Sequence, residues 1–173
     1  MDGYAIQAAM RGDPHAAGVF SGVFAADTLP RTLGDKPAFI VANGQCSHME
    51  GDHWVAIVVD SAGRGEYFDS YGRPPIVKSH RQFLNRNCAR WTYNDACLQS
   101  IGSDVCGQYC VAYLLHRAHH FTLQDFIKDY FSEDTEKNDR IVTNLYNQHV
   151  KCMRHCHDYP PLRSNQTCCA RKI

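Results

Sequence analysis

The sequence has no long hydrophobic run, no internal repeat and no excess of charge of either sign. Its longest apolar runs, WVAIVV (54–59) and CVAYLL (110–115), fall far short of the roughly 20 residues that a membrane-spanning helix needs. The N-terminus also lacks the basic start and apolar stretch of a secretion signal. The 18 basic and 18 acidic residues cancel, so net charge gives no bias toward nucleic acid. We therefore expect a soluble, intracellular protein that binds no membrane.

The chain is also too short for two comfortable domains, although its 173 residues, 44% of them hydrophobic, can build one packed core. We expect a single domain over residues 1–150. The tail over 151–173 differs, because it holds four cysteines and five basic residues against one acid. Nine cysteines would indicate disulfides in a secreted chain. Without a secretion signal, they favour core packing, metal binding or catalysis.

Hydrophobic periodicity divides the chain into strands in its first half and helices in its second. Apolar runs rich in β-branched and aromatic residues predict strands over 38–43, 53–60, 65–70 and 91–94. The turn residues at 61–65 predict a hairpin between the second and third of these strands. Helical spacing appears over 3–11, 77–88, 106–119, 123–131 and 135–150, whereas 12–37 is expected to be irregular. This segregation favours an α+β fold over a doubly wound parallel sheet.

Three residues from separate elements suggest nucleophilic catalysis. Cys106 opens an apolar helix, where unpaired N–H groups and the helix dipole lower a thiol pKa and favour the nucleophilic thiolate. His53 begins one strand of the predicted hairpin and Asp69 ends the other, so an antiparallel pairing brings them together. Asp69 can then orient the imidazole of His53 toward Cys106. Taken singly, Cys106 would be a core residue, His53 an ordinary buried or surface histidine, and Asp69 a turn residue.

Gln99 adds a fourth component to this arrangement. It lies in the polar segment QSIGSDV, seven positions before Cys106. Its side-chain amide could donate to an oxyanion next to the backbone N–H of Cys106, and one such donor is worth roughly 3 kcal/mol of transition-state stabilisation. The combination of four residues is far more specific than any one of them.

With these residues, the segments GDHWVAIVVD, EYFDSYG and QSIGSDVCGQYC resemble the adenovirus-type cysteine proteases (adenain) over roughly residues 20–120. That family belongs to a wider group that includes the proteases of ubiquitin-like modifiers. The resemblance implies an α+β, broadly papain-like cysteine protease domain that needs no cofactor. It implies Cys106 as nucleophile, His53 as general base and acid, Asp69 as orienter and Gln99 as oxyanion donor.

The resemblance leaves the substrate open among three alternatives. A maturation endopeptidase would cut viral or virus-like precursor proteins at small or glycine residues, in a virion or a host nucleus. The second alternative is a protease of ubiquitin-like modifiers. Asp69 allows it, because the adenovirus enzymes usually have Glu at this position, whereas modifier proteases have Asp. The third is a catalytically silent relic that binds DNA or protein.

The resemblance also implies partners for what we expect to be a monomer. Adenovirus enzymes are stimulated by DNA and by a peptide that can attach through a disulfide. Cys88 precedes Gln99 by the spacing of the peptide-linking cysteine; the alternative is a core residue at a helix end. The basic tail would suit DNA. The spacing of Cys152, His155, Cys156 and His157 is not a clean zinc pattern, so we expect no metal.

Overall fold

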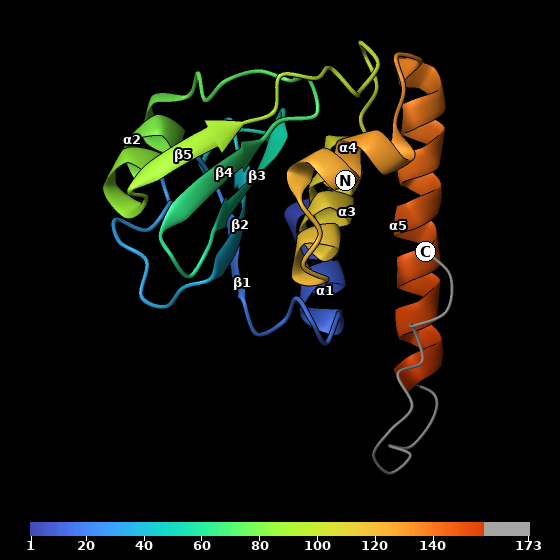
Figure 1. The fold of residues 1–173 in the computed structure, drawn as a ribbon, viewed down its shortest axis with the longest axis horizontal. Helices are drawn as coiled ribbons and strands as arrows, with labels where there is room; N and C mark the ends of the chain where they lie inside the picture. Colours follow the sequence, from blue (N-terminus) through green and yellow to red (C-terminus); the bar gives the residue numbers. More distant parts are fainter. Residues whose placement is uncertain (158–173) are drawn as a thin grey trace.

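The computed structural model describes residues 1–157, with side chains through Met153, and is built around one mixed sheet (Figure 1). Its strand order is β1-β2-β3-β4-β5, formed by Phe20–Phe24, Ala38–Asn43, Trp54–Val59, Arg64–Phe68 and Arg90–Tyr93. The two outer pairings, β1 with β2 and β4 with β5, are parallel. The central pairings are antiparallel, and β3 and β4 form the predicted hairpin. The expected α+β class is confirmed.

Both faces of the central strands are buried, which explains why their sequences are continuously apolar rather than alternating. Phe39 and Val41 of β2 face one core, while Ile40 and Ala42 face the other. On the first face lie α1 (Gly3–Gly12), α3 (Cys106–Ala118), α4 (Leu123–Tyr130) and α5 (Thr135–His157). On the second face α2 (Lys78–Asn87) contributes Phe83 and Leu84 to the core (Figure 1).

Local sequence signals fix the ends of several helices. Asp2 caps α1, because its carboxylate accepts the N–H of Ala5 at 2.8 Å. Thr122 and Asp125 form a reciprocal capping box at the start of α4, as their spacing predicts. Helix α3 has no side-chain cap at Val105, so its first N–H groups are open toward the end of the sheet where β3 begins.

The structure differs from the sequence expectation in the segment 12–37. This segment contains β1, which the glycine and proline content concealed. Gly22 adopts a φ of +145° at an irregularity in the β1–β2 pairing, so the strand lacks a regular alternating pattern. Helix α5 continues through position 150 to His157, and the proposed boundary between 150 and 151 therefore falls within a helix. None of the helices within residues 1–157 combines the length and the hydrophobicity of a transmembrane span.

Candidate active site

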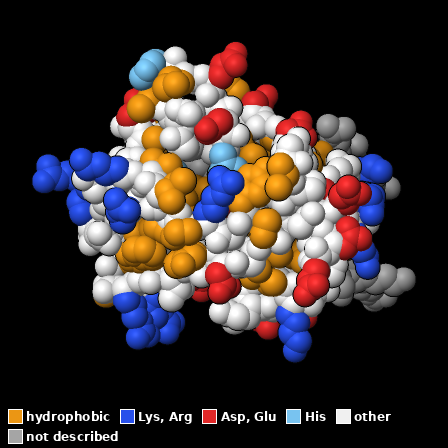
Figure 2. Space-filling model, turned by 90° about the horizontal axis from the view of Figure 1, so that it is seen from above, with side chains coloured by type: hydrophobic (Ala, Val, Ile, Leu, Met, Phe, Trp, Pro, Cys, Tyr) orange, Lys and Arg blue, Asp and Glu red, His pale blue; other side chains and the backbone are white. Residues whose placement is uncertain are grey.

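One end of the sheet brings three predicted site residues together. His53 immediately precedes β3, and Asp69 immediately follows β4. Because Ala56 pairs with Phe68 in the antiparallel register, the start of β3 lies beside the end of β4. Helix α3 packs against β3 and presents its first residue, Cys106, to the same end. Figure 2 shows a histidine side chain near the middle of one face of the molecule, with hydrophobic side chains and a Lys or Arg side chain next to it.

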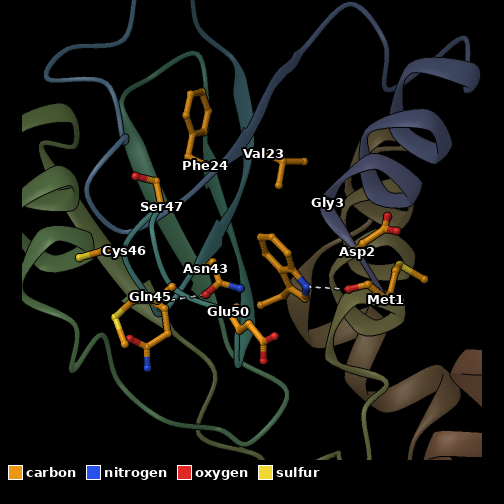
Figure 3. A pocket seen from close by; sticks show the side chains of 14 residues that line it. Met1, Asp2, Gly3, Val23, Phe24, Asn43, Gln45, Cys46, Ser47 and Glu50 are labelled. Carbon is orange, nitrogen blue, oxygen red and sulfur yellow. Dashed lines mark hydrogen bonds between the residues drawn. The ribbon is translucent and has the colours of Figure 1, made fainter.

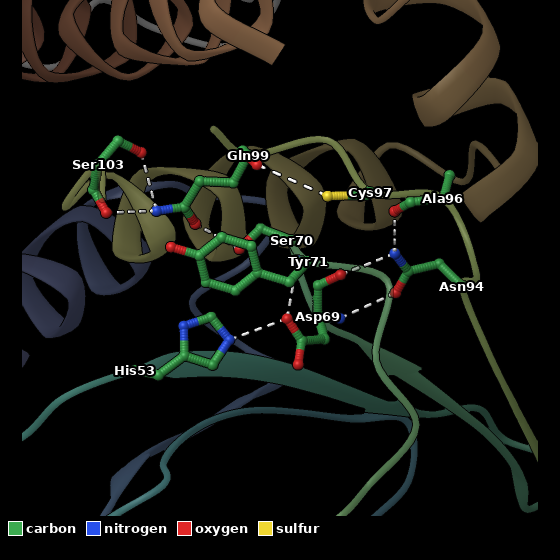
Figure 4. Close-up of polar contacts among 9 residues, drawn as sticks. All are labelled: His53, Asp69, Ser70, Tyr71, Asn94, Ala96, Cys97, Gln99 and Ser103. Atoms are coloured by element: carbon green, nitrogen blue, oxygen red, sulfur yellow. Dashed lines mark hydrogen bonds and ion pairs between the residues drawn. The ribbon is translucent and has the colours of Figure 1, made fainter. Parts of the chain in front are cut away.

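His53 and Asp69 form the polar contact that the hairpin predicts. Nε2 of His53 lies 2.9 Å from Oδ1 of Asp69, whose side chain is almost fully buried (Figure 4). The same oxygen accepts the backbone N–H of Tyr71 at 2.8 Å. These two donors hold the buried carboxylate in place, and the carboxylate in turn fixes the plane of the imidazole. Because Nε2 of His53 faces Asp69, Nδ1 is the ring nitrogen that is available to the thiol of Cys106.

The thiol of Cys106 is buried and lies close to the imidazole of His53. Burial alone would raise the pKa of Cys106. The hydrogen bond with His53 and the backbone N–H groups of Trp54 and Gly107 outweigh burial, so the pKa of this thiol is lowered. Burial would likewise lower the pKa of His53, but its interactions with Asp69 and Cys106 raise that pKa to about 9. The two shifts favour a thiolate–imidazolium pair near neutral pH.

Asn94 holds the acid in position, and sequence reasoning missed it. Its Oδ1 accepts the backbone N–H of Asp69 at 2.9 Å, and its Nδ2 donates to the Asp69 carbonyl at 2.7 Å (Figure 4). Asn94 is buried directly after β5, which pairs with β4. Its position at the end of the predicted strand 91–94 was the one available signal.

Gln99 is buried near this turn, but its amide does not face an open site. Its Oε1 accepts the hydroxyl of Ser70 at 2.6 Å, and its Nε2 donates to the backbone carbonyl and the hydroxyl of Ser103, at 2.8 and 3.0 Å (Figure 4). Both amide hydrogens are therefore engaged within the protein. The predicted role as oxyanion donor requires at least one of these bonds to Ser103 to be exchanged for the substrate.

Two elements distant in sequence hold the segment around Gln99. Tyr109 of α3 donates its hydroxyl to the carbonyl of Leu98 at 3.0 Å, and Asn138 of α5 donates to the same carbonyl at 3.2 Å. Asp139 of α5 accepts the hydroxyl of Ser100. Helix α5 thus helps to position the loop that leads to Cys106, and nothing in the local sequence of 98–105 indicates this.

The exposed side of the imidazole is partly covered by an aromatic ring. The ring of Tyr71 lies with its centroid 5.1 Å from that of His53, tilted by 34°. The guanidinium of Arg73 lies 4.9 Å from the centre of the Tyr71 ring, in cation–π geometry. Gly72 allows the sharp turn between them, with a φ of +69° and its N–H bonded to the Asp69 carbonyl at 2.8 Å.

Cys88 lies at the other side of the sheet from Cys106. It caps the C-terminus of α2 and packs against Trp91 and Gly65, and burial raises the pKa of its thiol. These contacts fit the alternative of a packing residue. Its attachment to an activating peptide stays a prediction.

The tail's proposed DNA contact and most of its basic residues lie outside the described residues, as do the side chains of His155, Cys156 and His157. In the part of the chain that the structure describes, no three His, Cys, Asp or Glu side chains converge as a metal site would need.

No protein-family model matches this chain, and no curated protein matches it. Among solved structures, the ASFV pS273R protease superimposes with a TM-score of 0.55 and 18% identity over 83% of this chain. The match covers 66% of that protease, so this chain spans just under two thirds of its length. The SUMO protease Ulp1, with its catalytic cysteine oxidised to a sulfonic acid, matches with a TM-score of 0.50 and 14% identity, over 87% of this chain and 78% of Ulp1. The chain therefore has the α+β fold of these cysteine proteases.

Proposed function

We propose that this protein is a cysteine endopeptidase in which Cys106 attacks a peptide carbonyl. The observation that carries the proposal is the contiguous row Cys106–His53–Asp69, with a lowered thiol pKa at one end and a buried carboxylate at the other. The fold shared with cysteine proteases supports it. A core cysteine would need neither the histidine nor the acid, and burial would keep its thiol protonated, as it does for Cys110.

The reaction follows from these contacts in two steps. The thiolate of Cys106 forms a bond to the carbonyl carbon, and the negative charge on oxygen is stabilised by the N–H of Cys106 at the open start of α3. When the C–N bond breaks, protonated His53 gives its proton to the leaving amine. His53, now neutral, takes a proton from water, whose oxygen attacks the thioester and releases Cys106. Asp69 keeps the ring in place throughout. Gln99 would add a second oxyanion donor after leaving Ser103.

For the substrate, we place first a precursor protein cut at small or glycine residues, in a virus or a virus-like element. The likeness to the ASFV pS273R protease supports this choice. The second candidate is a modifier protease, which the likeness to the SUMO protease Ulp1 and the aspartate at position 69 favour. For either candidate we propose two activators. One is a peptide that is joined through Cys88, and the other is DNA that is bound by the tail.

The test compares the wild-type chain with Cys106→Ala on two substrates: a library of Gly-containing peptides, and a fluorogenic modifier C-terminus. Each is assayed with and without DNA and a thiol-containing peptide, and a thiol-alkylating probe is followed by mass spectrometry. We expect cleavage and labelling at Cys106 in wild type only. Preference for the modifier substrate would select the second candidate. Wild type that neither cleaves nor labels at Cys106 under any condition would leave only the silent relic.

A further inference from the structure

A pocket of about 580 Å³ lies beside the candidate active site and is built from three separate segments (Figure 3). Residues Met1–Gly3 form one wall, the loop 43–51 forms the other wall, and the end of β1 with Val23 and Phe24 lies at the top of the view. Trp54 lines the pocket and directly follows His53 in the chain. The pocket is an open groove on the surface rather than an enclosed core cavity, because Met49 is 51% exposed at its edge.

The groove begins next to the nucleophile. The backbone N–H of Trp54 helps to lower the pKa of the Cys106 thiol and so lies close to it, while the indole of the same residue lines the groove. The indole N–H donates to the Met1 carbonyl at 3.0 Å, and Met1 packs so closely on Gly107 that a Cβ there would lie 3.0 Å from the Met1 sulfur. A peptide whose carbonyl reaches Cys106 must therefore pass beside Trp54 and along the N-terminal wall.

The charged side chains that line the groove are both acidic. Asp2 lies on the N-terminal wall and Glu50 on the opposite loop, and the described lining contains no Lys, Arg or His side chain. The apolar surface between them comes from Val23, Phe24 and Trp54. A long side chain with an apolar stem and a cationic end matches this combination, since the stem covers the hydrophobic surface and the charge meets the carboxylates.

A second feature of the groove independently indicates an extended peptide. Asn43 is only 4% exposed, yet its Nδ2 has no hydrogen-bond partner, while its Oδ1 accepts the N–H of Gln45 at 2.9 Å. A buried amide donor without an acceptor is unfavourable, and a peptide carbonyl is the acceptor that satisfies it. Gly51 packs directly against this nitrogen, because a Cβ at that position would lie 2.5 Å from it.

We propose that this groove selects a substrate with a lysine or arginine side chain close to the cleaved bond, held between Asp2 and Glu50, with a neighbouring peptide carbonyl bonded to Asn43. The inference rests on the proposed function and names a substrate class for it. The N-terminal segment then serves as part of the specificity site, because it carries one of the two carboxylates and the carbonyl that holds Trp54.

The experiment uses the full chain and Gly-containing peptides in which each position within five residues of the cleaved bond holds lysine, norleucine or glutamate in turn. Norleucine keeps most of the lysine stem and removes its charge. At one position we expect kcat/KM to be highest for lysine and lowest for glutamate. Asp2→Asn preserves the cap of α1, and Glu50→Gln preserves length; each should reduce the lysine-to-norleucine ratio by about two- to five-fold. Glu133→Gln, an exposed acid between α4 and α5, is the matched control.

Salt and binding measurements separate this inference from the proposed function. The lysine preference should shrink when salt rises from about 0.05 to about 0.5 M, because exposed charges are screened. Labelled lysine and norleucine peptides are also titrated onto Cys106→Ala by fluorescence anisotropy, which needs no cleavage. If wild type cleaves but no position prefers lysine, or if the preference survives in the Asp2→Asn/Glu50→Gln double variant, the inference fails and the proposed function stands. If wild type cleaves no peptide, equal binding of the lysine and norleucine peptides to Cys106→Ala overturns the inference.

Discussion

The hydroxyl of Ser70 donates to the side-chain carbonyl of Gln99 at 2.6 Å, in a part of the protein where both residues are buried. Ser70 directly follows Asp69, so this bond joins the turn that holds the acid to the loop that leads to Cys106. The backbone carbonyl of Ser70 strengthens the connection, because it accepts the N–H groups of Leu98 and Gln99 at 2.8 and 3.0 Å. Ser70 therefore links the turn of the acid to the predicted oxyanion donor.

Ser70→Ala removes the donor and leaves the Gln99 carbonyl unpaired in the interior. We expect a loss of about 1–3 kcal/mol in the free energy of unfolding, measured with urea. We also expect kcat to fall more than KM rises, because the side chains of Gln99 and Asp69 would both be held less firmly in position. Ser61→Ala, in the exposed hairpin turn, is the control. Unchanged stability would mean that the bond to Gln99 contributes nothing.

Gln99→Ala tests the oxyanion role separately from the nucleophile. If Gln99 donates to the oxyanion, kcat should fall by about 10²–10³ while the rate of Cys106 alkylation stays the same. Ser103→Ala is the companion variant, because it removes one of the two acceptors that hold the Gln99 amide. It should raise kcat by about two- to five-fold, since only one hydrogen bond of the Gln99 amide must then be broken before this amide turns to the substrate. A fall in kcat for Ser103→Ala would indicate that the Ser103 bond is part of the active arrangement.

The sequence predicted most of this fold, because its signals were local or followed from one pairing. The hairpin over 53–70 placed His53 beside Asp69, and the helix start placed Cys106 at an open N-terminus; the structure has both features. Strand β1 was missed since its glycine disrupts the alternating pattern.

Asn94, Tyr71 and the α5 contacts to the Gln99 loop were also missed. These are tertiary contacts between segments far apart in the chain, such as Asn138 with Leu98, and residue spacing carries no information about them. The Ser103 bonds of Gln99 belong to the same class of feature, because they depend on how the loop 100–105 is folded rather than on its distance from Cys106.

The ionisation of Cys106 should be visible in its alkylation by iodoacetamide as a function of pH. Because the pKa of Cys106 is lowered, the rate should rise at lower pH than it does for a free thiol, whose pKa is about 8.5. His53→Gln removes the first of the interactions that lower this pKa, so the rise should move to higher pH. Labelling is read by mass spectrometry, with exposed Cys97 as the internal comparison. Coincident profiles for wild type and His53→Gln would contradict the ion pair.

Asp69→Asn should shift the alkaline limb of kcat/KM to lower pH. The pKa of His53 is raised to about 9 partly by Asp69, so the imidazolium in wild type persists until pH approaches that value. Without the carboxylate, the pKa of His53 falls and the proton needed by the leaving amine is lost at a lower pH.

The pairing of His53 with Asp69 also stabilises the fold. Because the pKa of His53 is raised, this stabilisation is fully present below about pH 6.5 and is lost as pH rises through about 9. Thermal unfolding of wild type and Asp69→Asn should therefore differ most at low pH within the folded range and converge near pH 9, and Asp129→Asn serves as the control.

Cys88 can be tested as a packing residue by a double-mutant cycle with Gly65. A Cβ at position 65 would lie 2.6 Å from the Cys88 sulfur and 2.9 Å from Cβ of Trp91, so Gly65→Ala should reduce the free energy of unfolding by about 1–3 kcal/mol. Cys88→Ala removes the nearer of these two obstacles. The double variant should therefore be more stable than the sum of the single effects predicts, with a remaining loss due to Trp91.

The same thiol should also react slowly in the folded protein, because burial raises its pKa. Disulfide formation with a thiol-containing peptide should accordingly need an opening of the contact between β4 and the end of α2. If instead Cys88 in wild type forms that disulfide as fast as Cys97, and the cycle shows no coupling with Gly65, then Cys88 is an accessible attachment point. The peptide-linking role that its spacing implies would then be favoured over core packing.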